Sequence, residues 1–115
     1  MDIMGLFAAV YVTDLDRSLA WYAKIVGRDA DHRPMPTLAQ WVGVAGAGLQ
    51  LFLDPAKAGR GRMTLVTPDV DKAKAELARN GVAAGETFRG DFGAIAEVED
   101  PDGNLVTLAE PPKPR

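Results

Sequence analysis

Cysteine is absent from this sequence, histidine occurs once, and no hydrophobic run is long enough to cross a bilayer. Without cysteine the chain can form no disulfide, no thiol nucleophile and no thiolate metal site. The segment from Met1 to Gly5 has no basic stretch ahead of an apolar one, which argues against a signal peptide. The formal net charge of -3 offers no clustered positive charge for nucleic acid or for an anionic membrane. We therefore expect a cytoplasmic protein that contacts neither nucleic acid nor membranes.

The chain does contain enough apolar residues to build one compact core. Its 115 residues are 47% hydrophobic and 25% charged, a balance typical of ordinary globular domains. This length suits a single domain and is too short for two independent ones.

One pattern occurs twice along this domain. The segment Val12-Thr13-Asp14-Leu15-Asp16 matches Thr67-Pro68-Asp69-Val70-Asp71, a shift of 55 positions (69 − 14). Each copy begins with an apolar strand, continues into a helix capped by an aspartate, and leads to about three further strands. A repeat of this length indicates duplication of a unit that cannot bury its sheet alone. We predict an α+β fold of two βαβββ modules, residues 6–53 and 62–110, with 54–61 as a linker and 111–115 as a tail.

Local signals place the elements of each module. Asp14 or Asp16 is expected to cap the first helix, which ends at Gly27, and the second helix is expected between Pro68-Asp69 and Asn80-Gly81. Prolines restrict a strand near 29–33 to a short or edge position, and residues 45–48 are expected to form a hairpin loop. The remaining strands are expected at 6–12, 38–44, 49–53, 62–67, 82–86, 94–98 and 105–109.

Two motifs resemble those of a known family. Val12-Thr13-Asp14-Leu15-Asp16-Arg17-Ser18-Leu19-Ala20-Trp21-Tyr22, followed by Gly27, resembles the opening V-x-D-L-x-x-S-x-x-F/W-Y…G of the vicinal oxygen chelate superfamily. Asp100-Pro101-Asp102-Gly103-Asn104, followed by Leu108, is similar to the closing D-P-D-G-N-x-x-x-L of that family, which contains glyoxalases, bleomycin-resistance proteins and extradiol dioxygenases. The resemblance covers nearly the whole chain except the tail. It implies two βαβββ modules that form a curved mixed sheet around a cavity, and commonly a homodimer.

The resemblance also implies where a metal would be held. Enzymes of this superfamily bind one divalent metal through His, Gln or Glu side chains on four strands. Here the first-strand position is Phe7, its counterpart in the second module is Arg62, and the closing-strand position is Thr107, so that only Gln50 keeps a possible ligand. Phenylalanine has no lone pair and arginine is a permanent cation. These replacements argue against metal-dependent catalysis, and we predict no metal, no cofactor and no catalytic residue.

Strand alternation predicts which side chains line the cavity. If Leu49, Leu51 and Leu53 pack on the helices, then Gln50 and Phe52 face the cavity. The same reasoning for the other strands gives an aromatic wall with a few polar groups, which is the usual composition of a small-molecule pocket. The predicted ligand-binding residues are Phe7, Tyr11, Trp41, Gln50, Phe52, Arg62, Thr64, Phe92 and Thr107.

Several of these residues have an alternative interpretation. Trp41 can instead cover a dimer interface, where tryptophan is enriched. Arg62 can pair with Glu97 or another acid as a structural ion pair. Residues 89–93, which include Phe92, can form a loop over the cavity, although an ordinary glycine-rich turn is the preferred interpretation. His32, the single histidine, has no evident acid or nucleophile partner and is expected at the surface.

These features favour a binding protein that sequesters a small, partly aromatic molecule such as a drug or metabolite, which includes a role in antibiotic resistance. A metal-dependent enzyme of the glyoxalase or dioxygenase type is the alternative. A third hypothesis is a regulatory or structural module whose cavity is filled by its own side chains.

Overall fold

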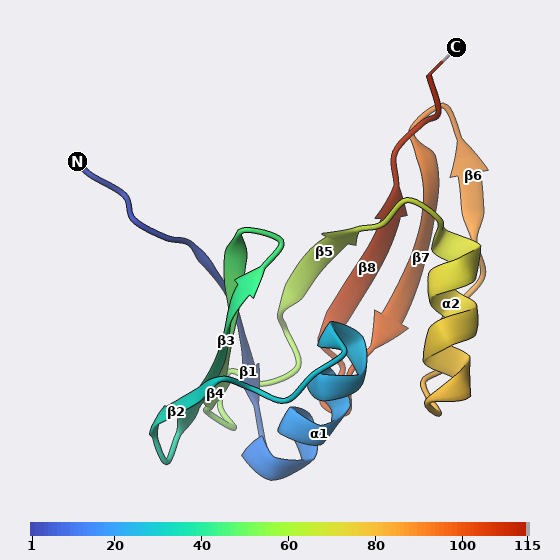
Figure 1. Ribbon diagram of the computed structural model, residues 1–115. Coiled ribbons are helices and arrows are strands. Elements are labelled where there is room, and N and C mark those ends of the chain that lie inside the picture. The colour runs from blue at the N-terminus through green and yellow to red at the C-terminus, as the bar shows by residue number, and fades with distance from the viewer. Residues whose placement is uncertain (115) are drawn as a thin grey trace.

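The computed structural model describes residues 1–114 and contains two βαβββ modules, as the sequence repeat predicts (Figure 1). Each module folds into a four-stranded mixed sheet, ordered β1-β4-β3-β2 in the first sheet and β5-β8-β7-β6 in the second. The first module contains β1 (Phe7–Val12), α1 (Leu15–Val26), β2 (His32–Met35), β3 (Leu38–Val44) and β4 (Ala47–Leu53). The second contains β5 (Arg62–Val66), α2 (Val70–Arg79), β6 (Phe88–Gly90), β7 (Gly93–Glu99) and β8 (Leu105–Glu110).

The two modules have equivalent strand pairing. β1 runs parallel to β4 and β5 runs parallel to β8, while the other pairs in each sheet are antiparallel. Phe7 is opposite Gly48 in the first sheet, and Arg62, which follows Phe7 by 55 positions in the repeat, is opposite Leu105 in the second. Residues directly opposite each other lie on one face, so positions on one sheet have counterparts on the other.

Capping residues determine where the two helices begin and where α1 ends. The carboxylates of Asp14 and Asp69 each accept a hydrogen bond from the backbone N–H three residues further on, so both residues are N-caps. Asp14 is thus the cap of α1, and Asp16 lies in its first turn. Gly27 ends α1 in the left-handed conformation that glycine adopts without steric cost. No helix within residues 1–114 is long and apolar enough to cross a membrane.

One hydrophobic core lies on the helix-facing sides of the two sheets. α1 packs on β3 and β4, and α2 packs on β7 and β8 (Figure 1). Buried residues alternate along the strands, for example Val10 and Val12 on β1 and Leu49 and Leu51 on β4. The side of each sheet that faces away from this core is called its open face. Every second residue of a strand therefore belongs to the core, and the residues between them belong to the open face.

The turn at 100–104 fastens the second module to the first. The Asn104 side chain is fully buried; its carbonyl accepts from the Gly61 N–H at 2.7 Å, and its amide donates to the Tyr11 carbonyl at 2.9 Å. The Tyr22 hydroxyl donates to the Asp100 carboxylate at 2.8 Å. Tyr11 and Tyr22 belong to the first module, so the two motifs that resemble the family are in direct contact in space.

One strand prediction is wrong, and the bounds of one loop and one strand are refined. Residues 82–86 form no strand, because the Val82 N–H closes the end of α2 by donating to the Leu77 carbonyl at 2.9 Å, and the second strand of this module is β6 instead. The loop predicted at 45–48 is a two-residue turn at Ala45-Gly46, where both residues have positive φ. The strand predicted near 29–33 is β2, which lies at the sheet edge as expected.

The proline-rich tail adds no strand to the second sheet. Residues 111–114 are exposed and have no regular secondary structure. This agrees with the absence of a donor N–H in proline. Arg115, the last residue of the predicted tail, lies outside the described residues.

A β-bulge at residues 42–43 shifts the register of β3. Next to the turn, Val44 is opposite Ala47, but further along Trp41 is opposite Leu49 instead of Gln50. Gly43 has a φ of 65°, a conformation that glycine supplies at such bulges. A one-residue shift moves every later side chain to the other face of the sheet. Residues 38–41 of β3 therefore lie on the face opposite to the one that unbroken alternation predicts.

Side chains replace the backbone partners that Val42 loses at this bulge. The Val42 N–H donates to the Asp31 carboxylate at 2.7 Å, and the Val42 carbonyl accepts from the Arg28 guanidinium at 2.5 Å. Arg28 and Asp31 form an ion pair at 2.7 Å. Hydrogen bonds from Arg28 and from the Val42 N–H hold the pKa of Asp31 below its usual range. The bulge is therefore stabilised by the segment between α1 and β2.

Candidate functional site

The open face of the first sheet carries aromatic and amide side chains in rows that cross the strands. The rows consist of Leu38, Phe52 and Tyr11; of Gln40, Gln50 and Ala9; and of Gly48 and Phe7. We call the set Phe7, Tyr11, Gln40, Gln50 and Phe52 the aromatic–amide face. An amide row thus lies between two rows that contain aromatic rings.

The rings of the aromatic–amide face have defined neighbours. The centroids of Tyr11 and Phe52 are 5.8 Å apart and their planes are inclined by 41°. The ammonium of Lys57, from the linker, lies 5.1 Å from the centroid of the Tyr11 ring, within the range of cation–π attraction. The Phe7 ring lies against Gly48, where a Cβ would overlap its edge. Glycine at position 48 leaves the space that this ring occupies.

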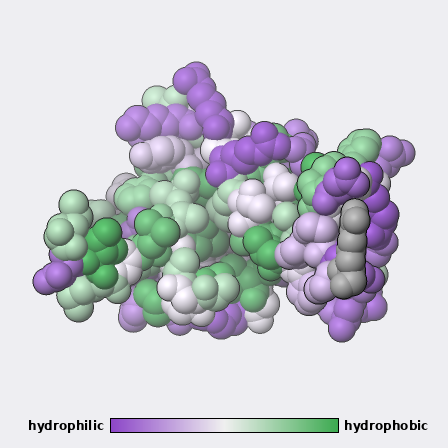
Figure 2. Space-filling view, turned by 90° about the horizontal axis from the view of Figure 1, so that it is seen from above, coloured by the Kyte–Doolittle hydropathy of each residue, from purple (hydrophilic) through white to green (hydrophobic). Residues whose placement is uncertain are grey.

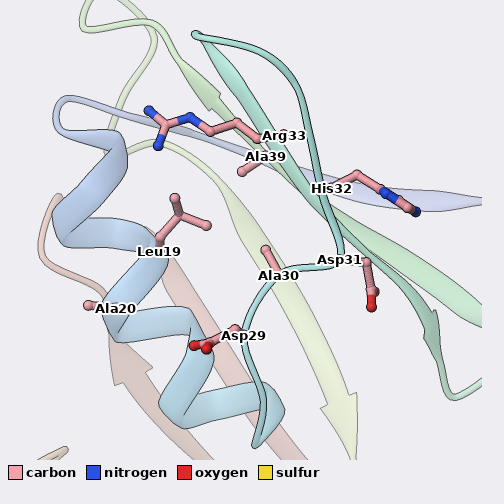
Figure 3. A pocket seen from close by; sticks show the side chains of 8 residues that line it. All are labelled: Leu19, Ala20, Asp29, Ala30, Asp31, His32, Arg33 and Ala39. Carbon is pink, nitrogen blue, oxygen red and sulfur yellow. The ribbon is translucent and has the colours of Figure 1, made fainter.

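Gln40 is a member of this face that sequence reasoning missed. Gln50 Nε2 donates to Gln40 Oε1 at 3.1 Å across the β3–β4 pair, and both side chains are half-buried. His32 is opposite Gln40 on the edge strand β2, and Figure 3 shows its ring directed away from Leu19 of α1. The sequence carried one signal that could have placed Gln40 on this face. Gly43 is an isolated glycine within a predicted strand, and such a glycine often marks a bulge, which reverses the faces along the strand.

Trp41 does not lie on the open face, which corrects its assignment to the cavity wall or to a dimer interface. Its side chain is fully buried on the helix-facing side, and its indole N–H donates to the Arg28 carbonyl at 2.9 Å. The bulge at 42–43 is the physical reason, since it reverses the faces along β3.

The second sheet presents a different open face, where Arg62, Thr64 and Thr107 lie. Arg62 forms an ion pair with Glu97, as the structural interpretation predicts. Arg62 is on β5 and Glu97 is on β7, so the pair crosses the central strand β8. Thr107 on β8 is 9% exposed, and its hydroxyl is buried without a hydrogen-bond partner in residues 1–114. The predicted wall is therefore divided between two sheet faces.

The metal positions implied by the family do not form a donor set. Phe7 has no donor atom, and Arg62 is a cation already paired with Glu97. Gln50 shares its amide with Gln40. The described part of the chain holds no group of three or more His, Cys, Asp or Glu residues arranged to bind a metal. The residues present at these positions do not fit a divalent ion.

Residues 89–93 form part of the β6–β7 hairpin. Gly90 is opposite Gly93, which leaves Asp91 and Phe92 as a two-residue turn, in agreement with the preferred interpretation. Phe92 is exposed and lies against Gly90. Arg89 pairs with Asp71 at the start of α2 at 2.5 Å. Arg89 is thus tied to α2, and Phe92 is the exposed group of this turn.

Two of the hollows in the described part of the chain lie next to α1. One of about 530 Å³ lies between the modules, where Figure 2 shows apolar side chains gathered over the middle of the molecule; its lining includes Ile25, Val26, Val44, Leu49 and Leu65. The other, of about 420 Å³, lies beside α1 (Figure 3) and is lined by Leu19, Ala20, Asp29, Ala30, Asp31, His32, Arg33 and Ala39. Arg33 pairs there with Asp16 at 3.0 Å. Among the predicted ligand-binding residues, only Thr64 lines either hollow.

The comparisons with known proteins agree with this architecture. The sequence model of the Glyoxalase/Bleomycin resistance protein/Dioxygenase superfamily matches residues 6–108. The chain belongs to this superfamily. A comparison with curated protein sequences gives no match.

Solved structures of superfamily members resemble the chain along nearly its whole length. A glyoxalase/bleomycin resistance protein from Catenulispora acidiphila is 31% identical, with a TM-score of 0.85 over 96% of this chain and 100% of that one. TnmS3, an antibiotic binding protein from Streptomyces sp. CB03234, is 31% identical, with a TM-score of 0.81 over 96% and 98%. A lactoylglutathione lyase from Agrobacterium tumefaciens is 22% identical over 91% of each chain, with a TM-score of 0.76, and shows the shared fold alone.

Proposed function

We propose that this superfamily member is a cytoplasmic protein that binds a small, partly aromatic molecule without a metal, and that it sequesters a drug or metabolite. The observation that carries the proposal is the aromatic–amide face, where three rings and two amides are together on one open sheet. Planar ligands gain dispersion and stacking energy on such rings, and a few polar groups fix their orientation.

Two further observations support a binding role over metal-dependent chemistry. The positions implied for metal ligands carry a phenyl ring, a paired guanidinium and a hydroxyl, which supply no coordinating set. TnmS3, a relative of similar length, is an antibiotic binding protein. A binding protein of this kind needs the fold of the superfamily and the aromatic surface, but not the metal.

A thermal-shift screen of planar drugs and metabolites, run with a chelator in excess, tests the proposal. A ligand at 100 times its Kd should stabilise the protein by about 2.7 kcal/mol and raise Tm by roughly 11 °C. Phe52→Ala should abolish the shift, whereas Phe88→Ala, an equally large deletion at an exposed position of the second sheet, should keep it. A shift that appears only after Zn, Mn, Ni or Fe is added would support the metal-dependent enzyme instead.

We also propose that the chain forms a homodimer. Val66 is 72% exposed and Phe88 is 60% exposed on the open face of the second sheet, while Phe7 is 38% exposed on that of the first. β1 and β5 are edge strands whose outer sides have no partner strand in residues 1–114. Exposed apolar side chains beside free sheet edges are typical of surfaces that pair with another chain.

A further inference from the structure

The structure points to the Gln40–Gln50 pair as the group that selects the ligand. We propose that it recognises a neutral, planar molecule whose edge carries a hydrogen-bond donor beside an acceptor, as in a lactam or imide. This inference rests on the proposed function, because it concerns the aromatic–amide face, and it adds the chemical class of the ligand.

The pairing of the two amides leaves one donor and one acceptor free. Gln50 Nε2 donates to Gln40 Oε1 at 3.1 Å, and within residues 1–114 neither Gln40 Nε2 nor Gln50 Oε1 has a hydrogen-bond partner. If both amides were flipped, the pair would use the opposite atoms and would still leave one donor and one acceptor. The free groups therefore do not depend on how the amides are oriented.

The surroundings of the pair favour a flat ligand. The Tyr11–Phe52 row lies on one side of the amide row and Phe7 lies on the other. Side chains of a strand stand roughly perpendicular to the sheet, so the amides rise between rings on which a planar molecule can rest. A ligand stacked on either set of rings places its edge next to the free donor and acceptor.

The charges near this face favour a neutral ligand. Lys57 is the cation nearest to the Tyr11 ring and already lies over it. Arg62 belongs to the other sheet and is paired with Glu97. The amide row itself, formed by His32, Gln40, Gln50 and Ala9, holds no permanently charged side chain, so a charged ligand edge would lose water there without meeting a fixed opposite charge. A lactam edge, with an N–H beside a carbonyl, offers both partners without a charge.

Isothermal titration with three planar probes of similar size tests the inference. The probes are 2-quinolone, which has the N–H beside the carbonyl, N-methyl-2-quinolone, which lacks the donor, and naphthalene, which lacks both groups. We expect 2-quinolone to bind about tenfold more tightly than the N-methyl compound, since one hydrogen bond is lost. Gln50→Ala removes the free acceptor and should remove this difference, whereas Gln40→Ala removes the free donor and should weaken the binding of both quinolones; each should change naphthalene binding less than about twofold. Asn80→Ala, which deletes an exposed amide just after the end of α2, is the matched control and should leave all three affinities unchanged.

The outcomes separate this inference from the proposed function. Equal affinities for 2-quinolone and N-methyl-2-quinolone, with binding lost in Phe52→Ala, would overturn the role of the amide pair and keep the aromatic–amide face as the site. The same conclusion would follow if Gln50→Ala kept the tenfold difference and Gln40→Ala left the affinities of both quinolones unchanged. Binding of every probe that is unaffected by Phe52→Ala would place the ligand elsewhere and overturn both proposals.

Discussion

Burial decides how much each polar contact contributes to stability. The Arg62–Glu97 pair has side chains that are 60% and 46% exposed, so solvent screens it and its net contribution is small. Asn104 is fully buried, and its side chain bonds the Gly61 N–H and the Tyr11 carbonyl, so solvent competes less with these hydrogen bonds. The turn therefore holds the modules together through the neutral side chain of Asn104 and through the carboxylates of Asp100 and Asp102, which accept from Tyr22, Thr13 and Arg17 of the first module.

Asn104→Ala should lower the free energy of unfolding by about 2–4 kcal/mol, because it deletes a fully buried side chain that bonds the Gly61 N–H, the Tyr11 carbonyl and the Asp100 carboxylate. Asn80→Ala is the matched substitution at an exposed position and should cost less than about 1 kcal/mol. Urea denaturation of the three proteins measures both values. Similar losses for the two variants would show that the turn does not fasten the modules.

Tyr22 makes stability depend on pH in the alkaline range. Burial, reinforced by the charge of Asp100 and the hydrogen bond to it, raises the pKa of Tyr22 far above its ordinary value of 10.0. The unfolded chain therefore loses this proton at a lower pH than the folded chain, so the contribution of Tyr22 is complete below pH 10 and is lost as pH rises further.

The variant Tyr11→Phe leaves Tyr22 as the single tyrosine and makes this prediction measurable. During an alkaline titration the tyrosinate absorbance should appear only together with the loss of circular dichroism. If tyrosinate formed near pH 10 while the protein stayed folded, the burial of this hydroxyl would be refuted.

At the scale of elements, the sequence predicted features that depend on neighbours along the chain. Asp14, Asp69 and Gly27 act within one helical turn, so the limits of both helices were predictable. Gly43 alone only hinted at the bulge in β3, because the contacts that support it come from the segment between α1 and β2. One unpredicted bulge moved Trp41 into the core and brought Gln40 to the site.

Asp31→Ala should loosen this bulge. Val42 would lose the acceptor of its N–H, and we expect its amide hydrogen to exchange at least roughly tenfold faster in the variant. In the unchanged protein the pKa of Asp31 is low, so its carboxylate stays charged at neutral pH. The hydrogen bond that this carboxylate accepts from Val42 weakens only as the pH falls below 3.8. Asp29→Ala, at a neighbouring exposed position, is the control. Unchanged exchange at Val42 in Asp31→Ala would contradict the side-chain support of the bulge.

At the scale of the whole molecule, two open sheets leave apolar side chains in water. The chain extends over 47 × 38 × 25 Å, and its radius of gyration of 14.6 Å exceeds the value of about 13 Å expected for a compact domain of this length. Family motifs and the internal repeat were sufficient to predict both modules. The relation between the two open faces was not predictable, because it depends on packing between distant segments and on any second copy.

Val66→Lys tests the proposed dimer. A lysine on the edge strand β5 disfavours strand pairing and adds charge to an apolar surface. Light scattering after size exclusion should give the mass of a dimer for the unchanged protein and that of a monomer for the variant. Ala83→Lys adds the same charge on an exposed loop and should remain dimeric. A monomeric mass for the unchanged protein at micromolar concentration would contradict the proposal.

The central claim is that the open face of the first sheet binds a planar molecule without a metal. Nuclear magnetic resonance of the side-chain amides tests it most directly, because Gln40 and Gln50 are the only two glutamines in the chain. With a chelator present, titration with 2-quinolone should shift both glutamine NH₂ signals and leave those of Asn80 and Asn104 unchanged. Saturable binding that leaves both glutamine signals unmoved, or that requires an added divalent metal, would contradict the account.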